Sequence, residues 1–416
     1  ELLTSALALA GASALYSLGE AARAAAPAIP PEIPLSPANS VPGFRNWDRA
    51  NLRKTIAALA KVRSNTGSMT INVAGHSALM GEGSGTISGA GALTSGAQPF
   101  SVASVLSKHL NACPRLRARL ASVNSALKTP SRTDFAAYDA RCTLTSDWTF
   151  ATGDAGVGTG GYLFMNSSGA GAFSITPTAS DGSSMVWDSA RVWYGVNSGL
   201  GTFTLDIGGT VYATQSTAGS IGLSSVSIGP GNTVSRTAQT LNIKRTTGGA
   251  VYPAMIEFWD STVNDIRVRG LGWSGSQASD WISNTYPYHA YSALPVMGGD
   301  LTIFECFRND QSHAVAPTTW QANFDACVAQ WRTFGDVIII VDHEPYTWTL
   351  TNDAQFRAGL QTISDKYSVP LVDIRYLMGS GPQAWAAGYG ASDNVHYSAI
   401  GWDVKGAILA EAISEL

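Results

Sequence analysis

The chain has 416 residues and a formal net charge of −4, and 13% of its residues are charged. This length is enough for two or three domains. The charged share is about half of the usual value, which excludes coiled coils and acidic disordered proteins. The slight acidic excess argues against a nucleic-acid partner, because phosphate contacts need clustered Lys and Arg.

The first 44 residues differ in composition from the rest of the chain. An Ala-rich stretch predicts a helix, and a Pro-rich run at 27–43 predicts an extended arm. Residues 2–19 are apolar, but they include Ser, Thr and Gly, and charged residues follow directly. We therefore expect no membrane insertion and no signal peptide here. The helix is expected to pack on the main domain or on a second copy in a homo-oligomer.

Residues 143–258 are expected to form an all-β insertion. Short runs of alternating apolar and polar residues follow one another, as in ARVWYGV and GTFTLDIGG. Turn residues separate these runs at intervals of ~8–12 residues, the spacing typical of β-sandwiches and jelly rolls. We expect most of the aromatic residues in this segment to form its core.

The segments on either side of this insertion, 45–142 and 259–416, alternate between strands and helices. The fold class is therefore α/β, with a parallel sheet that carries helices on both faces. The expected sheet has five strands, at 69–75, 264–270, 300–307, 336–341 and 369–374.

The four cysteines leave two possibilities open. They stand at 113, 142, 306 and 327, and none forms a C-x-x-C pair, so zinc and thioredoxin-like sites lack their usual spacing. Cys113 and Cys142 flank one segment and could form a disulfide. Four buried free thiols are the alternative.

Candidate functional residues follow the predicted strands. Ligands of open parallel sheets bind beyond the carboxyl ends of the strands. Ser77 follows the first strand, Gly275 the second and Asn309 the third, and the pair Asp393 and His396 precedes the last helix. Gly272 is an alternative to Gly275 in the same turn.

These residue types together can support nucleophilic catalysis. A serine hydroxyl needs a base to remove its proton, and His396 can be that base. Asp393, three residues earlier, can accept a hydrogen bond from one ring nitrogen of His396 and leave the other for Ser77. The backbone N–H groups of Ser77 and Gly275 and the amide of Asn309 are suitable donors for an oxyanion hole.

Four motifs in this order resemble the SGNH (GDSL-like) hydrolases: VAGHSALMGEG, GLGWSGSQ, FRND and SDNVHYSAIG. The resemblance covers about 45–105 and 258–416. It implies a flavodoxin-like α/β/α esterase without metal or cofactor, in which Ser77, Gly275, Asn309 and His396 match the four name-giving residues. The chain departs from the family at His76, where an acidic residue is usual, and at Phe307, where glycine is usual.

An SGNH-like domain with an inserted jelly roll is similar to carbohydrate acetylesterases, including deacetylases of phage tail spikes. The resemblance implies a serine esterase that removes acetyl groups from a polysaccharide, located outside the cell or on a virion, and a trimer if it is a tail spike. Trp273, His343 and Trp385 are expected to contact substrate. No metal is expected, because Asp342, His343 and Glu344 are adjacent residues that seldom converge on one ion.

Two other functions remain open at this point. The chain could be a non-catalytic glycan-binding module of a tail protein or adhesin, which the altered first and third motifs favour. It could also be a lipase or thioesterase for longer acyl chains, although the Gly- and Ser-rich loop after Ser77 disfavours a broad apolar groove.

Overall fold

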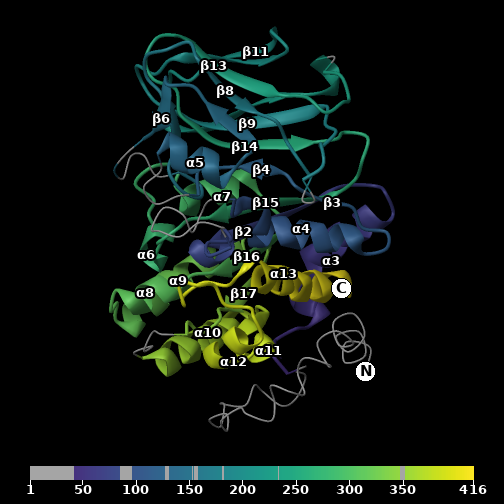
Figure 1. Cartoon of the computed structure of the whole chain (residues 1–416), viewed down its shortest axis with the longest axis vertical. Coiled ribbons are helices and arrows are strands. Elements are labelled where there is room, and N and C mark those ends of the chain that lie inside the picture. Colours follow the sequence, from purple (N-terminus) through teal and green to yellow (C-terminus); the bar gives the residue numbers. More distant parts are fainter. Residues whose placement is uncertain are drawn as a thin grey trace.

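The computed structural model describes residues 42–84, 96–126, 131–151, 153, 158–179, 182–232, 234–346 and 352–416. The predicted N-terminal helix and nearly all of the Pro-rich arm lie outside these residues. Two parts follow each other along the long axis of the molecule, an α/β part and a part built of antiparallel sheets (Figure 1).

The α/β part is organised around a seven-stranded sheet with the order β1-β18-β17-β16-β2-β15-β3. The five expected strands are present and parallel, but the predicted number was too low. Two very short strands extend the edges, β3 parallel to β15 and β1 antiparallel to β18. Strands of two or three residues carry no readable alternation. The bounds are β1 Phe44–Arg45, β2 Met69–Gly75, β3 Ala118–Leu120, β15 Ile266–Gly272, β16 Leu301–Glu305, β17 Asp336–Val341 and β18 Leu371–Asp373.

Helices cover both faces of this sheet, because successive residues of each central strand point to opposite faces. Ile338 and Ile340 of β17 belong to one buried cluster, while Ile339 and Val341 belong to the other. The first cluster includes α3 (Arg53–Arg63), α4 (Val102–Ala112) and α13 (Ala399–Ser414). The second includes α6 (Ala278–Trp281), α7 (Ala290–Met297), α9 (Pro317–Trp331) and α10 (Asp353–Tyr367).

Shorter helices join these elements and those of the antiparallel part. They are η1 Arg49–Asn51, η2 Ser77–Leu79, η3 Gln98–Phe100, α5 Arg132–Tyr138, η5 Pro230–Asn232, α8 Arg308–Ser312, α11 Ile374–Met378 and α12 Gly381–Ala386, of which α5 and η5 belong to the antiparallel part. None of the helices in the described part of the chain is both long and apolar enough to cross a bilayer.

The inserted part is a sandwich of two antiparallel sheets, with the orders β11-β10-β13-β8-β5 and β12-β9-β14-β4. Phe203 and Ile243 of the first sheet share a buried cluster with Val192 and Ile256 of the second. The bounds are β4 Ser122–Val123, β5 Cys142–Leu144, β8 Ala172–Ile175, β9 Ser189–Val196, β10 Thr202–Ile207, β11 Thr210–Ser216, β12 Gly222–Ile228, β13 Leu241–Thr247 and β14 Pro253–Trp259. A separate pair, β6 (Trp148–Phe150) and β7 (Phe164–Asn166), lies beside it.

The antiparallel sheets begin earlier in the chain than expected, because β4 pairs with β14. The expected start at residue 143 therefore misses β4, a strand of two residues. The jelly-roll connectivity stays a prediction. The cysteines are free thiols, three of them buried, so the possible disulfide between Cys113 and Cys142 is not formed.

Candidate active site

The turn after β2 brings a serine to the carboxyl end of the central strand. β2 ends at Gly75, whose φ of +152° favours glycine, and a Cβ there would lie 1.9 Å from the carbonyl oxygen of Glu305. Only glycine permits this close approach of β2 to β16. Ser77 then begins η2, and the ring Nδ1 of His76 accepts the backbone N–H of Ala78.

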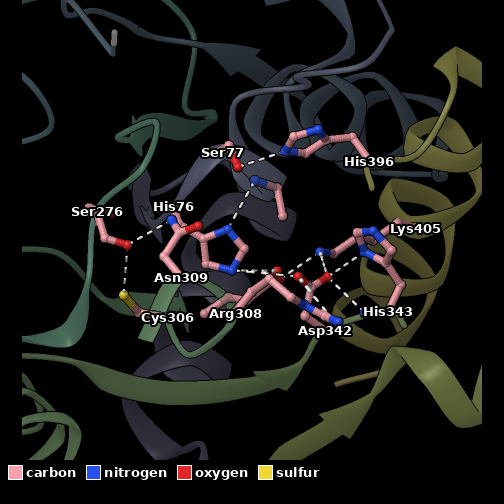
Figure 2. A network of polar contacts seen from close by, with 12 residues as sticks. His76, Ser77, Ser276, Cys306, Arg308, Asn309, Asp342, His343, His396 and Lys405 are labelled. Atoms are coloured by element: carbon pink, nitrogen blue, oxygen red, sulfur yellow. Dashed lines mark hydrogen bonds and ion pairs between the residues drawn. The ribbon is translucent and has the colours of Figure 1, made fainter. Parts of the chain in front are cut away.

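Ser77, His396 and Asp393 form a continuous hydrogen-bonded chain (Figure 2 shows Ser77 and His396). The Ser77 hydroxyl lies 2.9 Å from Nε2 of His396. Nδ1 of His396 lies 2.6 Å from Oδ2 of Asp393, which fixes the proton on Nδ1 and leaves Nε2 as the acceptor. The other oxygen of Asp393 accepts the backbone N–H groups of Val395 and His396 at 2.9 and 3.0 Å.

The electrostatics of this chain suit a general base. Burial lowers the pKa of His396, but the carboxylates of Glu82 and Asp393 outweigh burial and raise that pKa above its ordinary value. Burial raises the pKa of Asp393, but the hydrogen bonds and charge of His396 lower it to about 2. Asp393 is therefore a carboxylate at neutral pH and can stabilise an imidazolium at His396.

A cleft of about 280 Å³ opens beside Ser77. Gly275, with φ of +70°, and Asn309 line it together with Ser77. One N–H of the Asn309 amide donates to the carbonyl of Ser276 at 2.9 Å, which fixes the amide while its second N–H stays available. The alternative glycine, Gly272, belongs to β15, and a Cβ there would meet Met80 at 3.0 Å.

Of the three expected substrate contacts, only His343 lines the cleft. Trp273 is 8% exposed and packs edge-on against Tyr162 and Trp281, so it belongs to the core and does not line the cleft. Trp385 also lies outside the cleft lining, and its ring N–H donates to the carbonyl of Ala391. His343 does line the cleft, but it is buried and both of its ring nitrogens contact groups of the chain.

Two cleft residues were missed in the sequence. Glu82 accepts a hydrogen bond from the hydroxyl of Ser274 at 2.9 Å and raises the pKa of His396. Arg308 is buried beneath the cleft, beside Asn309. Both residues lie within motifs already singled out, Glu82 in VAGHSALMGEG and Arg308 in FRND. Neither the spacing nor the residue type indicated which groups they contact.

A buried polar cluster of His76, Glu305, Asp342, His343 and Lys405 borders the cleft, and three of its members, His76, Asp342 and His343, line it (Figure 2 labels all but Glu305). Lys405 donates to Glu305 at 2.5 Å and lies 3.5 Å from Asp342. Burial would raise the pKa of Asp342, but His343 and Lys405 hold it well below its ordinary value. Burial and the charge of Asp342 raise the pKa of Glu305.

Three ligand atoms of this cluster, from His76, Glu305 and Asp342, lie within 4.8 Å of one another, which is close enough to hold a metal ion. The donor chemistry does not fit one. Nδ1 of His76 accepts a backbone N–H, so its proton is on Nε2, the atom that would have to bind the metal. Lys405 also supplies a positive charge where the cation would lie.

Comparisons with known proteins bear on the fold. No protein-family model and no curated protein matches the chain. A solved structure of a peptidoglycan O-acetylesterase superposes with a TM-score of 0.67 and 17% identity, covering 89% of this chain and 98% of that one. The resemblance to carbohydrate acetylesterases of the SGNH type that the motifs predicted is thereby confirmed for the fold.

Two family two carbohydrate esterases align less well. The one from Clostridium thermocellum has a TM-score of 0.30 and 13% identity, over 63% of this chain and 95% of that one. The one from Cellvibrio japonicus has a TM-score of 0.29 and 8% identity, over 71% of this chain and 98% of that one.

Proposed function

We propose that the protein is a serine esterase that removes O-acetyl groups from a polysaccharide. The observation that carries this proposal is the hydrogen-bonded chain from Ser77 through His396 to Asp393, which opens on a cleft lined by candidate oxyanion donors. A structural serine would need neither a base on its hydroxyl nor a carboxylate behind that base.

In the first half of the reaction, Oγ of Ser77 attacks the ester carbonyl and its proton passes to Nε2 of His396. The oxyanion accepts hydrogen bonds from the N–H groups of Ser77 and Gly275 and from the amide of Asn309. The tetrahedral intermediate then collapses. The C–O bond to the sugar breaks, the sugar oxygen takes the proton from His396, and the acetyl group stays on Ser77.

In the second half, His396 takes a proton from water and the resulting hydroxide attacks the acetyl-enzyme. The bond to Oγ breaks, the proton returns to Ser77, and acetate leaves. Asp393 stays ionised in both halves and compensates the charge of the imidazolium. No metal or organic cofactor takes part in this sequence.

The choice of an acetylated glycan has two supports. The protein with the similar fold is a peptidoglycan O-acetylesterase, which makes acetylated peptidoglycan the first polysaccharide to test. Among the described residues that line the cleft, Ala78 and Val395 carry the only apolar side chains. This lining suits a short acyl group and disfavours a lipase or thioesterase for long chains.

The remaining expectations belong to the same proposal. A location outside the cell or on a virion, a role in a phage tail and a trimeric state rest on composition, on the family resemblance and on residues 1–44. The proposal that the sandwich contacts glycan is based on the presence of the inserted domain.

The deciding experiment is acetate release by the full chain and by Ser77→Ala, with Ser64→Ala as a control at an exposed serine. The substrates are p-nitrophenyl acetate, p-nitrophenyl octanoate and a panel of O-acetylated polysaccharides that includes peptidoglycan. We expect acetate release that Ser64→Ala retains and Ser77→Ala loses. Equal background from all three proteins would refute the esterase and favour a glycan-binding module, and faster octanoate cleavage would favour a lipase.

A further inference from the structure

One carboxylate in the buried cluster contacts both halves of the candidate active site. Asp342 follows β17, is 1% exposed and lies between the ring of His76 on one side and His343 and Lys405 on the other (Figure 2). The catalytic sequence proposed above assigns it no step. Its two oxygens face different histidines. His343 contacts the loop that carries His396, and His76 contacts the turn that carries Ser77.

The first oxygen of Asp342 leads to the loop of the base. Oδ1 accepts the backbone N–H of His343 at 2.7 Å and lies 2.6 Å from Nδ1 of its ring. Nε2 of the same ring lies 2.8 Å from the carbonyl oxygen of Val395, the residue before His396. The ring also stacks on Tyr397, the residue after it, with centroids 4.0 Å apart. His343 thus contacts the residues directly before and after the base His396.

These contacts define the protonation of His343. A carboxylate and a backbone carbonyl can only accept hydrogen bonds, so both ring nitrogens must carry protons for both bonds to form. Burial lowers the pKa of His343 below its ordinary value, and the charge of Asp342 offsets only part of that effect. The geometry of the two contacts, at 2.6 and 2.8 Å, is what assigns a proton to each ring nitrogen and lets His343 bind both Asp342 and the loop at Val395.

The second oxygen of Asp342 leads to the turn of the nucleophile. Oδ2 lies 3.5 Å from Nε2 of His76, and an oxygen of Glu305 lies 3.6 Å from the same nitrogen. Nδ1 of His76 accepts the backbone N–H of Ala78, the residue after Ser77. Nε2 of His76 faces the two carboxylates but does not meet the geometry of a hydrogen bond with either of them. Burial lowers the pKa of His76 to about 3 and keeps this ring neutral, so the contact is one between a polar ring nitrogen and two carboxylates and is not an ion pair.

We propose that Asp342 is a positioning residue that fixes the Ser77 turn and the His396 loop relative to each other, through His76 on one side and His343 on the other. This inference rests on the proposed esterase function for its catalytic consequence. Lys405 and Arg308, which lie 3.5 and 3.8 Å from its oxygens, balance the buried charge.

The first test is kinetic and uses Asp342→Asn in the full chain. Asp373→Asn is the matched control, because Asp373 is a buried aspartate at the end of β18, the strand beside β17, and binds Arg357. We expect kcat on p-nitrophenyl acetate to fall about 10–100-fold in Asp342→Asn with little change in KM, since small misplacements of reacting groups cost about this much. A kcat equal to that of Asp373→Asn would overturn the proposal.

His76→Asn guards against a folding defect in Asp342→Asn. An Asn side chain can still cap the N–H of Ala78 but loses the contact with Asp342. The proposal expects this variant to lose kcat while its melting temperature stays near that of the parent. If His76 serves only as a cap, His76→Asn keeps full activity, and that result would contradict the link to Asp342.

The last test needs no activity. In protein labelled with ¹⁵N-histidine, the ring shifts report which nitrogens carry protons. We expect His76 to be neutral with its proton on Nε2, and His343 to carry both protons in the parent and to lose one in Asp342→Asn. A His343 that is neutral in the parent would refute the inference. Should the parent release acetate no faster than Ser77→Ala, the proposed function fails while these shifts still decide the positioning role.

Discussion

Nδ1 of His396 and Oδ2 of Asp393 lie 2.6 Å apart, and the same carboxylate accepts two backbone N–H groups of its own loop. The carboxylate thus orients the ring and also holds the loop in shape. These two roles can be separated, because an amide keeps the backbone hydrogen bonds but loses the charge.

Asp393→Asn is expected to lower kcat on p-nitrophenyl acetate by roughly 10⁴-fold, the loss seen when a triad aspartate is replaced by its amide. The amide neither selects the tautomer that leaves Nε2 free nor stabilises the imidazolium. Steady-state kinetics check this prediction, and thermal unfolding serves as the control for folding. A loss below tenfold would mean that His396 does not need Asp393.

The pH profile depends on Glu82. His396 must be neutral to take the proton of Ser77, so kcat/KM rises with pH through the pKa of His396, which lies above its ordinary value of 6.5. Glu82 stabilises the charged ring. Glu82→Gln is therefore expected to move the rising limb to lower pH, while Glu415→Gln, at the exposed C-cap of α13, leaves it in place. An unmoved limb in Glu82→Gln would count against this electrostatic role.

Asn309→Ala tests the oxyanion hole. The amide of Asn309 is held by Ser276, so it is oriented before substrate binds. Its removal is expected to lower kcat about 10²–10³-fold, the usual effect of losing one such donor, with KM nearly unchanged. Parallel loss of binding, seen as a raised KM at constant kcat, would instead assign Asn309 to substrate recognition.

The contact between the sandwich and the parallel sheet depends on a buried ion pair. Glu257 of β14 accepts from Arg269 of β15 at 2.8 Å and from the indole of Trp193 at 2.6 Å. Glu257→Leu leaves the guanidinium unpaired and is expected to lower the free energy of unfolding by about 3–5 kcal/mol, measured by urea denaturation. Lys108→Gln, which breaks an exposed ion pair with Asp403, is the control and should cause no measurable change.

Trp273→Phe separates a core role from a substrate contact. The indole packs among Tyr162 and Trp281 and does not line the cleft. The smaller ring is expected to lower the free energy of unfolding by about 1–3 kcal/mol and to leave KM unchanged. A raised KM with unchanged stability would restore Trp273 as a substrate contact.

The positions of Ser77, Asn309 and His396 could be predicted because each follows or precedes a strongly patterned element. Parallel strands end at one edge of the sheet, so topology alone brings together Ser77 and His396, which are 319 positions apart. Their catalytic roles stay predictions. The edge strands β1 and β3 could not be predicted. So short a strand is stabilised by pairing with a neighbouring strand, and the sequence does not show which strand that is.

The buried cluster was beyond prediction for a different reason. Glu305 lies within an apolar strand and Lys405 within an apolar helix, and each is a charge that needs a partner. Which partner it finds depends on which elements are neighbours in space. The position of Trp273 could not be predicted for a local reason, since the side chain of a residue inside a motif can point away from the residues that define the motif.

Three of the six histidines, His76, His343 and His396, line one cleft and have different hydrogen-bond partners. The side chains of His76 and His343 are 2% exposed, whereas that of His396 is 14% exposed and keeps Nε2 toward the cleft. Within this trio, only His396 is open to an electrophile from solvent. Among these three rings, a reagent that carbethoxylates imidazoles should therefore modify only His396 and abolish activity. A ligand bound in the cleft should protect His396 from this modification.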